Sequence, residues 1–183
     1  TFSEVENITA ESLHETILDT PGGCYSCPIR CKRRARVEGD GFSVDPRYGG
    51  PEYETVAAIT SLLGVSDPVV LARVNQLCSQ NTIDTISLGM TIAFAMECYE
   101  NGLITKEDCD GLSLRFGDKD VILPIVEKII NREGIGDILA EGSYRAAQHI
   151  GPQSYKYLVQ VKGQEVPMHD PRSKTGLGLQ YAL

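Results

Sequence analysis

The chain has 183 residues, of which 42% are hydrophobic, 23% charged and 7% aromatic, and its formal net charge is −8 at pH 7. This composition is typical of a folded domain with a hydrophobic core, and it argues against disorder. The acidic balance argues against nucleic-acid binding by the chain as a whole, and no apolar run approaches the roughly 18 residues that a membrane span needs.

The first third of the chain alternates short predicted helices with glycine- and proline-rich breaks. A cap at Thr9 predicts a helix over residues 9–19, which residues 21–23 (Pro-Gly-Gly) end. Residues 33–44 contain short alternating stretches around two glycines, which predict a small hairpin or an extended segment. A proline in the first turn then predicts a helix over residues 51–64 that stops at a glycine.

Predicted helices with short connections continue through the middle of the chain, over residues 69–80, 84–101, 118–133 and 136–149. After residue 151 the pattern changes to a short strand candidate at 157–161, followed by an ordered loop. Strands and helices do not alternate in βαβ fashion, and no glycine-rich phosphate loop has a strand–turn–helix setting. The predicted fold class is therefore mainly α, with a short hairpin or extended segment early in the chain.

The six cysteines divide into two groups. Cys24, Cys27 and Cys31 lie within eight residues, and the other three (Cys78, Cys98, Cys109) sit singly in segments predicted to be helical. Residues 1–20 lack the pattern of a secretory signal and the spacings do not suit a disulfide framework, so we expect a reducing compartment, the cytoplasm. We interpret the three single cysteines as core residues.

The C-x2-C-x3-C spacing of the first group indicates a metal site. Two C-x2-C hooks would indicate zinc, but only one is present. Three thiolates on a tightly curved loop suit an iron–sulfur cube, whose fourth thiolate would come from elsewhere. Five cations follow within seven residues (Arg30, Lys32, Arg33, Arg34, Arg36). They would raise the potential of an anionic cluster and steer an acidic electron carrier, or they form a solvated basic strand.

Four separated motifs, in this order, resemble the tungsten-dependent aldehyde:ferredoxin oxidoreductase family. They are C-x-x-C-P-x-x-C at 24–31, G-P-E-Y-E-T at 50–55, N-x-x-C…D-T-I-S at 75–87 and K-G-x-E-x-P-x-x-D-P-R at 162–172. The resemblance implies a multi-helical fold of the C-terminal type of that family. It also implies that residues 1–155 form a helical domain on the cluster and pterin side and that residues 156–183 begin a further, truncated helical domain. The N-terminal β domain and the rest of the third domain would lie outside this chain.

The resemblance also assigns candidate site residues. Cys24, Cys27 and Cys31 match three ligands of a 4Fe-4S cluster, whose fourth ligand would lie downstream of this chain. Glu54 matches a glutamate close to the metal, where a carboxylate can take a proton or orient a carbonyl group. Asp84 matches the last residue of the D-x-x-G-L-D pterin motif, from which residues 79–83 otherwise depart.

Each carboxylate also has a structural interpretation. From its position alone, Glu54 is a first-turn carboxylate favoured by the helix dipole, and Asp84 is a helix N-cap. For Asp84 the structural and binding roles are compatible. The histidine that partners the family glutamate would lie beyond the end of this chain, and His169 lies upstream of that place.

The implied function is that of part of an enzyme. A tungsten (rarely molybdenum) ion held by two pterins would oxidise an aldehyde to a carboxylate, and electrons would leave through the 4Fe-4S cluster to ferredoxin or another carrier. We expect this fragment alone to be inactive. The alternatives are a non-catalytic iron–sulfur electron-transfer module and an aromatic acyl thioester reductase of the same family.

Overall fold

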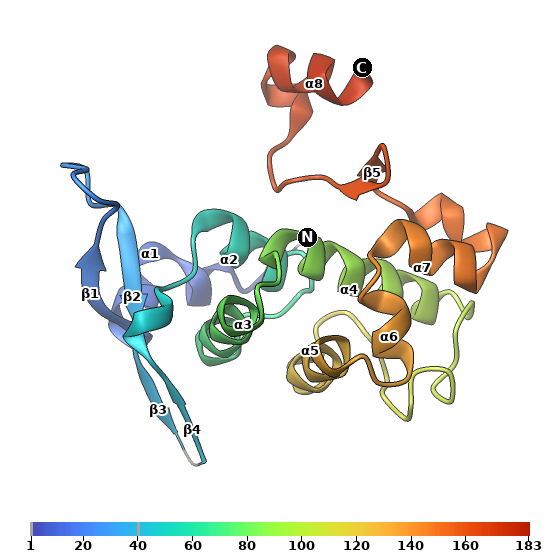
Figure 1. Cartoon of the computed structure of the whole chain (residues 1–183), viewed down its shortest axis with the longest axis horizontal. Helices are drawn as coiled ribbons and strands as arrows, with labels where there is room; N and C mark the ends of the chain where they lie inside the picture. The colour runs from blue at the N-terminus through green and yellow to red at the C-terminus, as the bar shows by residue number, and fades with distance from the viewer. Residues whose placement is uncertain (1, 40) are drawn as a thin grey trace.

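The computed structural model describes residues 2–39 and 41–183, and helices dominate it (Figure 1). The α-helices are α1 (Ala10–Thr16), α2 (Tyr53–Ile59), α3 (Pro68–Asn81), α4 (Thr85–Glu100), α5 (Ile122–Asn131), α6 (Ile135–Leu139), α7 (Ser143–Ile150) and α8 (Thr175–Ala182). Short 3-10 helices cover Val5–Ile8, Pro46–Tyr48, Lys119–Val121, Pro152–Tyr157 and Pro171–Ser173. The predicted mainly α fold class is confirmed.

The strands form three small antiparallel hairpins rather than one sheet. They pair β1 (Leu18–Gly22) with β2 (Lys32–Ala35), β3 (Val37–Gly39) with β4 (Phe42–Val44), and β5 (Gln160–Val161) with β6 (Gln164–Glu165). The first two hairpins project from one end of the helical body in Figure 1, and β6 of the third contacts α4 and α7. The predicted hairpin within residues 33–44 is confirmed by the β3–β4 pair.

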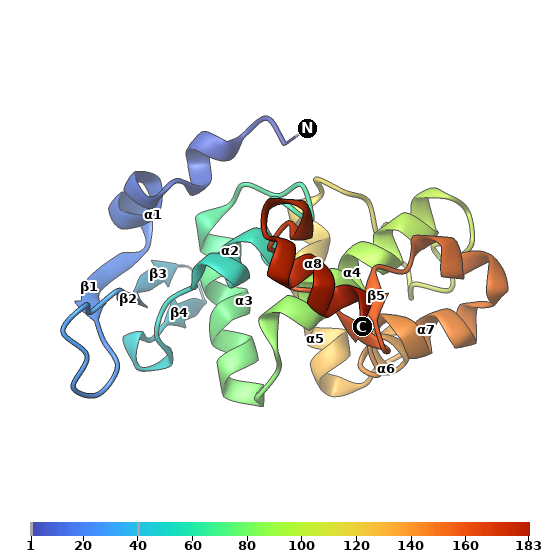
Figure 2. The ribbon, with the colours of Figure 1, turned by 90° about the horizontal axis from the view of Figure 1, so that it is seen from above.

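Helix α4 runs through the middle of the helical body, between α2 on one side and α6 and α7 on the other (Figures 1 and 2). Residues 88–96 and Cys98 are all buried, so this helix is apolar around most of its circumference. A helix that is hydrophobic all round belongs in a core. Helices α2, α6 and α7 pack against α4.

A glycine in α4 allows a close helix contact in the core. A Cβ atom at Gly89 would lie 2.8 Å from the carbonyl carbon of Ala58 in α2, and still nearer to its oxygen. Side chains this close do not occur without backbone movement, so only glycine lets α2 and α4 approach to this distance. This contact places the start of α2 beside the start of α4.

Three predicted helices differ from those in the structure. The helix predicted over 9–19 ends at Thr16, because residues 18–22 pair with residues 32–35 as strands. The helix predicted over 136–149 is divided into α6 and α7 at Gly142, whose φ of 87° is unfavourable for any other residue. The helix predicted over 51–64 is longer than α2, which ends at Ile59 and is followed by a turn.

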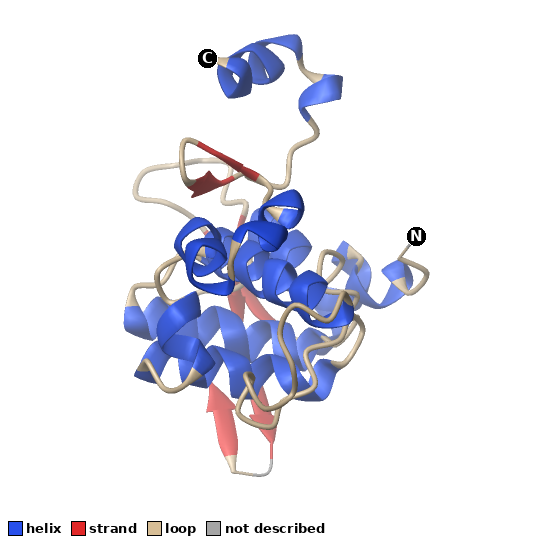
Figure 3. Cartoon of the chain, turned by 90° about the vertical axis from the view of Figure 1, so that its right-hand side faces the viewer, coloured by secondary structure: helices blue, strands red, loops and turns tan. Residues whose placement is uncertain are grey.

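The C-terminal segment stands apart from the helical body. In Figure 3, α8 is separated from the other helices by an extended stretch that follows β6. The short strand predicted over 157–161 is present only as Gln160–Val161, since a 3-10 helix occupies Pro152–Tyr157. Across the described residues, none of the helices is both long and apolar enough to cross a bilayer.

The α2–α4 contact gives a stability prediction. Gly89→Ala should lower the free energy of unfolding by about 1–3 kcal/mol, because the added methyl group overlaps the Ala58 carbonyl. The matched control is Gly176→Ala in α8, where a Cβ atom meets nothing within 4 Å. Urea unfolding of both variants measures the difference, and equal stability of Gly89→Ala and the parent chain would contradict the close packing.

Candidate functional site

The cysteine loop joins β1 to β2 at the outer end of their hairpin (Figure 1). Cys24 and Cys31 are exposed and Cys27 is half-buried, and all three are free thiols. The loop turns sharply: the Cys27 amide donates to the Cys24 carbonyl at 3.1 Å, and Ser26 and Arg30 have φ values of 57° and 52°. The three thiols therefore lie on one tightly curved and accessible segment.

This loop fits an iron–sulfur cluster in its donor chemistry and curvature. Thiolates are the ligands that such clusters use, and the loop supplies three of them. Within the described part of the chain, however, no three His, Cys, Asp or Glu side chains are gathered so that they could hold a metal ion. The assignment of Cys24, Cys27 and Cys31 as cluster ligands stays a prediction.

The other three cysteines are buried in the helical core. Cys78, Cys98 and Cys109 are between 0% and 1% exposed. Burial raises the pKa of Cys78 and of Cys98 to about 12, and that of Cys109 to about 11. A thiol that stays protonated is a poor metal ligand and a poor nucleophile. The interpretation of these three residues as core cysteines is confirmed.

A basic groove of about 450 Å³ lies at the base of the cysteine loop. Its charged lining residues are Lys32, Arg33, Arg34, Arg36, Arg47 and Asp45. Arg36 forms an ion pair at 3.0 Å with Asp19, which does not line the groove. Among residues 2–39 and 41–183, Lys32 and Arg34 have no ion-pair partner. The loop that carries the three thiols is therefore positively charged.

Glu54 lies in the first turn of α2, and its two carboxylate oxygens have different surroundings. Oε2 accepts a hydrogen bond from the Met168 amide at 2.7 Å. Oε1 lies 2.8 Å from Nε2 of His169, but the ring N–H is not aligned with it, so this buried oxygen has no well-directed hydrogen bond. Tyr53 stacks on the His169 ring, with 5.6 Å between centroids, and donates to the Met168 carbonyl at 3.2 Å.

The contact between Glu54 and His169 was not predicted from the sequence. The two residues are more than a hundred positions apart, and no local pattern links them. In the sequence, His169 lies upstream of the place of the family histidine, and that position gives no information about its contact with Glu54. In the structure, the Met168 amide and the His169 ring both contact the Glu54 carboxylate.

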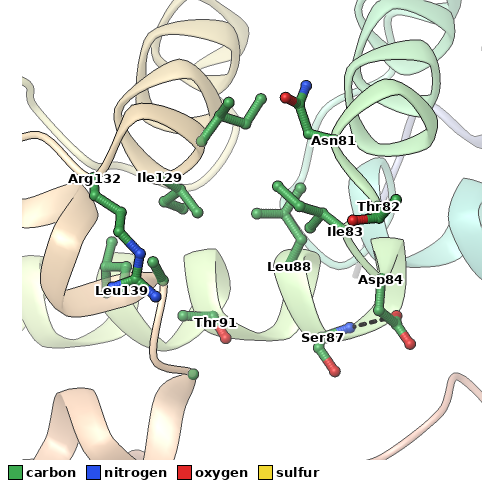
Figure 4. A pocket seen from close by; sticks show the side chains of 13 residues that line it. Asn81, Thr82, Ile83, Asp84, Ser87, Leu88, Thr91, Ile129, Arg132 and Leu139 are labelled. Atoms are coloured by element: carbon green, nitrogen blue, oxygen red, sulfur yellow. Dashed lines mark hydrogen bonds between the residues drawn. The ribbon is translucent and has the colours of Figure 1, made fainter.

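Asp84 begins α4 as the predicted N-cap. Its Oδ1 accepts from the amides of Ile86 at 2.7 Å and Ser87 at 3.0 Å. The residue lines a groove of about 420 Å³ between the α3–α4 turn, α4 and the α5–α6 region (Figure 4). Helix capping uses only one carboxylate oxygen, so the other is available to a ligand in this groove.

Thr82 precedes Asp84 in a left-handed conformation, with φ 56° and ψ 39°. It ends α3, and its amide donates to the Cys78 carbonyl. Glycine is the usual residue at such a helix end, and it stands at this place in the D-x-x-G-L-D motif. Thr82 therefore adopts here a conformation that glycine adopts more easily.

The structure brings Glu54 and Asp84 to neighbouring helix starts. The hydroxyl groups of Thr55 and Thr85, each one residue further along, are 2.8 Å apart. The hairpin that carries the cysteines is linked to the segment before α2: the Ala35 amide donates to the Gly49 carbonyl at 3.1 Å, and Arg33 donates to the Pro51 carbonyl at 3.3 Å. The three groups of predicted site residues are thus joined through residues 49–55.

Glu165 is a half-buried acid outside the predicted site residues. It accepts from the amide and the hydroxyl group of Ser143, both at 2.7 Å, and so caps α7 from the β5–β6 hairpin. Burial alone would raise the pKa of Glu165, but these hydrogen bonds outweigh it and hold the pKa below its ordinary value. Its place in the K-G-x-E motif was the one available signal.

The chain is similar to known oxidoreductases. A family model described as "Aldehyde ferredoxin oxidoreductase, domains 2 & 3" matches residues 1–183. A tungsten-containing aldehyde ferredoxin oxidoreductase of Pyrococcus horikoshii is 43% identical over 162 residues, which are 87% of this chain and 26% of that protein. The aliphatic sulfonate oxidoreductase WOR-like subunit of Pyrococcus furiosus is 35% identical, over 82% of this chain and 24% of its own length.

A solved structure is also similar. It is the active site complex BamBC of benzoyl coenzyme A reductase in complex with 1,5-dienoyl-CoA, with a TM-score of 0.70 and 30% identity. The match covers 85% of this chain and 22% of that one. The chain thus spans about a quarter of the length of the proteins that it resembles.

The two cysteine groups should differ in reactivity. In the metal-free, reduced chain at pH 8, iodoacetamide should alkylate Cys24, Cys27 and Cys31 first. The buried thiols should react at least about a hundredfold more slowly, because their raised pKa leaves almost no thiolate. Mass spectrometry of the peptides measures the rates, with fully denatured chain as control. A buried cysteine that reacts as fast as Cys24 would contradict this division.

The turn before Asp84 predicts a stabilising substitution. Thr82→Gly should raise the free energy of unfolding by about 0.5–1 kcal/mol, because a left-handed conformation costs a β-branched residue more than the flexibility of glycine costs. Thr9→Gly is the control, since Thr9 has φ −66° and its side chain caps α1. Urea unfolding compares the variants, and a destabilised Thr82→Gly chain would show that the turn is not strained.

Proposed function

Because the chain belongs to the aldehyde ferredoxin oxidoreductase family, we propose that it is the central part of an enzyme that oxidises an aldehyde to a carboxylate and passes the electrons to ferredoxin. The observation that carries the proposal is the Glu54 carboxylate, which has a buried and unpaired oxygen at the junction of the family motifs. Since the chain spans about a quarter of its relatives, the complete activity requires parts outside it.

Glu54 is the proposed catalytic residue. A tungsten (or molybdenum) ion held by two pterins, when bound, supplies the two-electron chemistry, which no side chain can supply. The Met168 amide fixes Oε2 of Glu54, and the carboxylate, which has about four acceptor sites in all, can still accept a proton from the hydrated aldehyde or orient its carbonyl group. The orientation of the carboxylate is thus set by the protein before the substrate binds.

Asp84 is the proposed pterin contact. Its Oδ1 is engaged by the two amides at the start of α4, which fixes the side chain. The other oxygen can accept hydrogen bonds from ring nitrogens of the pterin in the adjoining groove of about 420 Å³. Capping and binding are compatible, because each uses a different oxygen.

The cysteine loop is the proposed site of a 4Fe-4S cluster. Cys24, Cys27 and Cys31 would supply three thiolates, and the fourth would come from downstream of this chain. The unpaired charges of Lys32 and Arg34 would stabilise the reduced, more anionic cluster and favour an acidic carrier such as ferredoxin. Cluster and thiols require a reducing compartment, so we place the enzyme in the cytoplasm.

We also propose a domain division. Residues 1–155 would form the domain on the cluster and pterin side, and residues 156–183 would begin the next one. The separation of α8 from the helical body supports a change of domain in this region (Figure 3). The contacts of residues 168 and 169 with Glu54 would then lie between the two domains.

Reduction of an aromatic acyl thioester is the second candidate. The similarity to the benzoyl coenzyme A reductase complex favours it, at a TM-score of 0.70 and 30% identity. Substrate tests on the full-length protein, with aldehydes and with benzoyl-CoA, separate the two activities. A protein that binds iron and sulfide but no tungsten or pterin would instead be an electron-transfer module.

Replacement of Glu54 tests the proposed function. In the full-length holoenzyme, Glu54→Gln should lower kcat for aldehyde oxidation by about 10²–10⁴-fold, because the amide cannot take a proton. Glu52→Gln is the matched control: it lies two positions earlier at the N-cap of α2, is exposed, and makes no side-chain capping bond. Its kcat should change less than about twofold.

The metal content of each protein must be measured together with its kcat. The tungsten content per chain should be the same in the parent, Glu54→Gln and Glu52→Gln proteins. The iron content per chain should also be the same in all three. Equal activity of the parent and Glu54→Gln enzymes, at equal metal content, would overturn the catalytic role of Glu54.

A further inference from the structure

Two buried polar atoms lack an aligned hydrogen-bond partner among the described residues. They are Oε1 of Glu54 and the hydroxyl oxygen of Tyr181. Buried polar groups are nearly always hydrogen-bonded, because an unpaired one loses its interactions with water without compensation. Each of these atoms therefore needs an explanation.

Tyr181 belongs to the C-terminal helix α8, and it lies near enough to Glu54 for the charge of that carboxylate to act on its hydroxyl group, although the two are not hydrogen-bonded in this structure. The segment that leads to α8 is fixed to α2 by Met168 and His169, through their contacts with Tyr53 and Glu54. Residues from two distant parts of the chain thus converge on one carboxylate.

The chemistry of the two unpaired atoms is complementary. Burial, and secondly the negative charge of Glu54, raise the pKa of Tyr181, so its hydroxyl group stays protonated and is a donor. Oε1 of Glu54 is an acceptor with two lone-pair sites. Nε2 of His169 is already 2.8 Å from it and needs only reorientation of the ring to donate.

We infer that His169 and Tyr181 are positioning residues for Glu54, and that their N–H and O–H groups hold Oε1 in place while the Met168 amide holds Oε2. The inference rests on the proposed function, because it assigns these residues to the carboxylate that takes the substrate proton. Hydrogen bonds to a carboxylate fix its rotamer and orientation. Glu54 would otherwise be anchored through one oxygen only.

A purely structural role is the competing explanation. His169 and Tyr181 would then serve only to attach the C-terminal segment to α2, and their loss would loosen the segment without a specific effect on turnover. Two observations separate the two roles: the division of the effect between kcat and KM, and rescue by a residue that keeps the donor.

The test uses the full-length holoenzyme with the variants Tyr181→Phe, His169→Phe and His169→Gln. Tyr181→Phe and His169→Phe should each lower kcat about tenfold, with KM changed less than twofold, which is the effect of one lost hydrogen bond to a charged group. His169→Gln keeps an N–H donor of similar reach and should recover about half of the loss. The control is Tyr155→Phe, whose ring is 46% exposed in a 3-10 helix away from α2.

Hydrogen exchange provides a measurement that does not depend on turnover. The Met168 amide donates to Glu54, so it should exchange faster in Tyr181→Phe and His169→Phe than in the parent and in Tyr155→Phe. If the enzyme oxidises no aldehyde, the proposed function fails, but faster exchange in these variants would still show that His169 and Tyr181 help to keep Met168 on Glu54. Unchanged kcat and unchanged Met168 exchange in both Phe variants, or equal loss of kcat in His169→Gln and His169→Phe, would overturn the inference.

Discussion

The backbone from residue 49 to residue 55 connects the three parts of the molecule that carry candidate site residues. Its carbonyl groups accept from the β2 strand next to the cysteine loop, at Gly49 and Pro51. Its Thr55 hydroxyl group contacts that of Thr85, beside Asp84. Its Tyr53 and Glu54 hold residues 168 and 169 of the C-terminal segment. A shift of this short segment would therefore move every candidate group relative to the others.

The core explains how this segment keeps its place. Gly89 lets α4 approach the backbone of α2 at Ala58, so the two helices begin at the same end of the body. Helix α4 is buried along most of its length, and its position is set by packing on several sides. Glu54 and Asp84 are thus held by a rigid core, as binding and proton transfer require. The cysteine loop, in contrast, is exposed at the end of a two-stranded hairpin.

The features that could be predicted from the sequence are those determined locally. Asp84 caps α4 because its side chain reaches amides two and three residues away, and such caps are visible as short patterns. The end of α1 could not be predicted from the local sequence, because residues 18–22 pair with a strand more than ten residues away. Glu165 caps α7 from 22 positions downstream, and the contact of His169 with Glu54 spans a still longer separation. Contacts of this kind depend on the complete fold, and the ligand geometry of Cys24, Cys27 and Cys31 depends on the metal as well.

We propose that residues 49–55 place a tungsten site beside Glu54 and a separate iron site at the cysteine loop. Anomalous diffraction at the tungsten and iron absorption edges, from crystals of the full-length protein, would locate both metals. We expect a tungsten peak on the Glu54 side of α2 and iron peaks within bonding distance of Cys24, Cys27 and Cys31. A tungsten peak remote from Glu54, or iron bound elsewhere than at these three thiols, would contradict it.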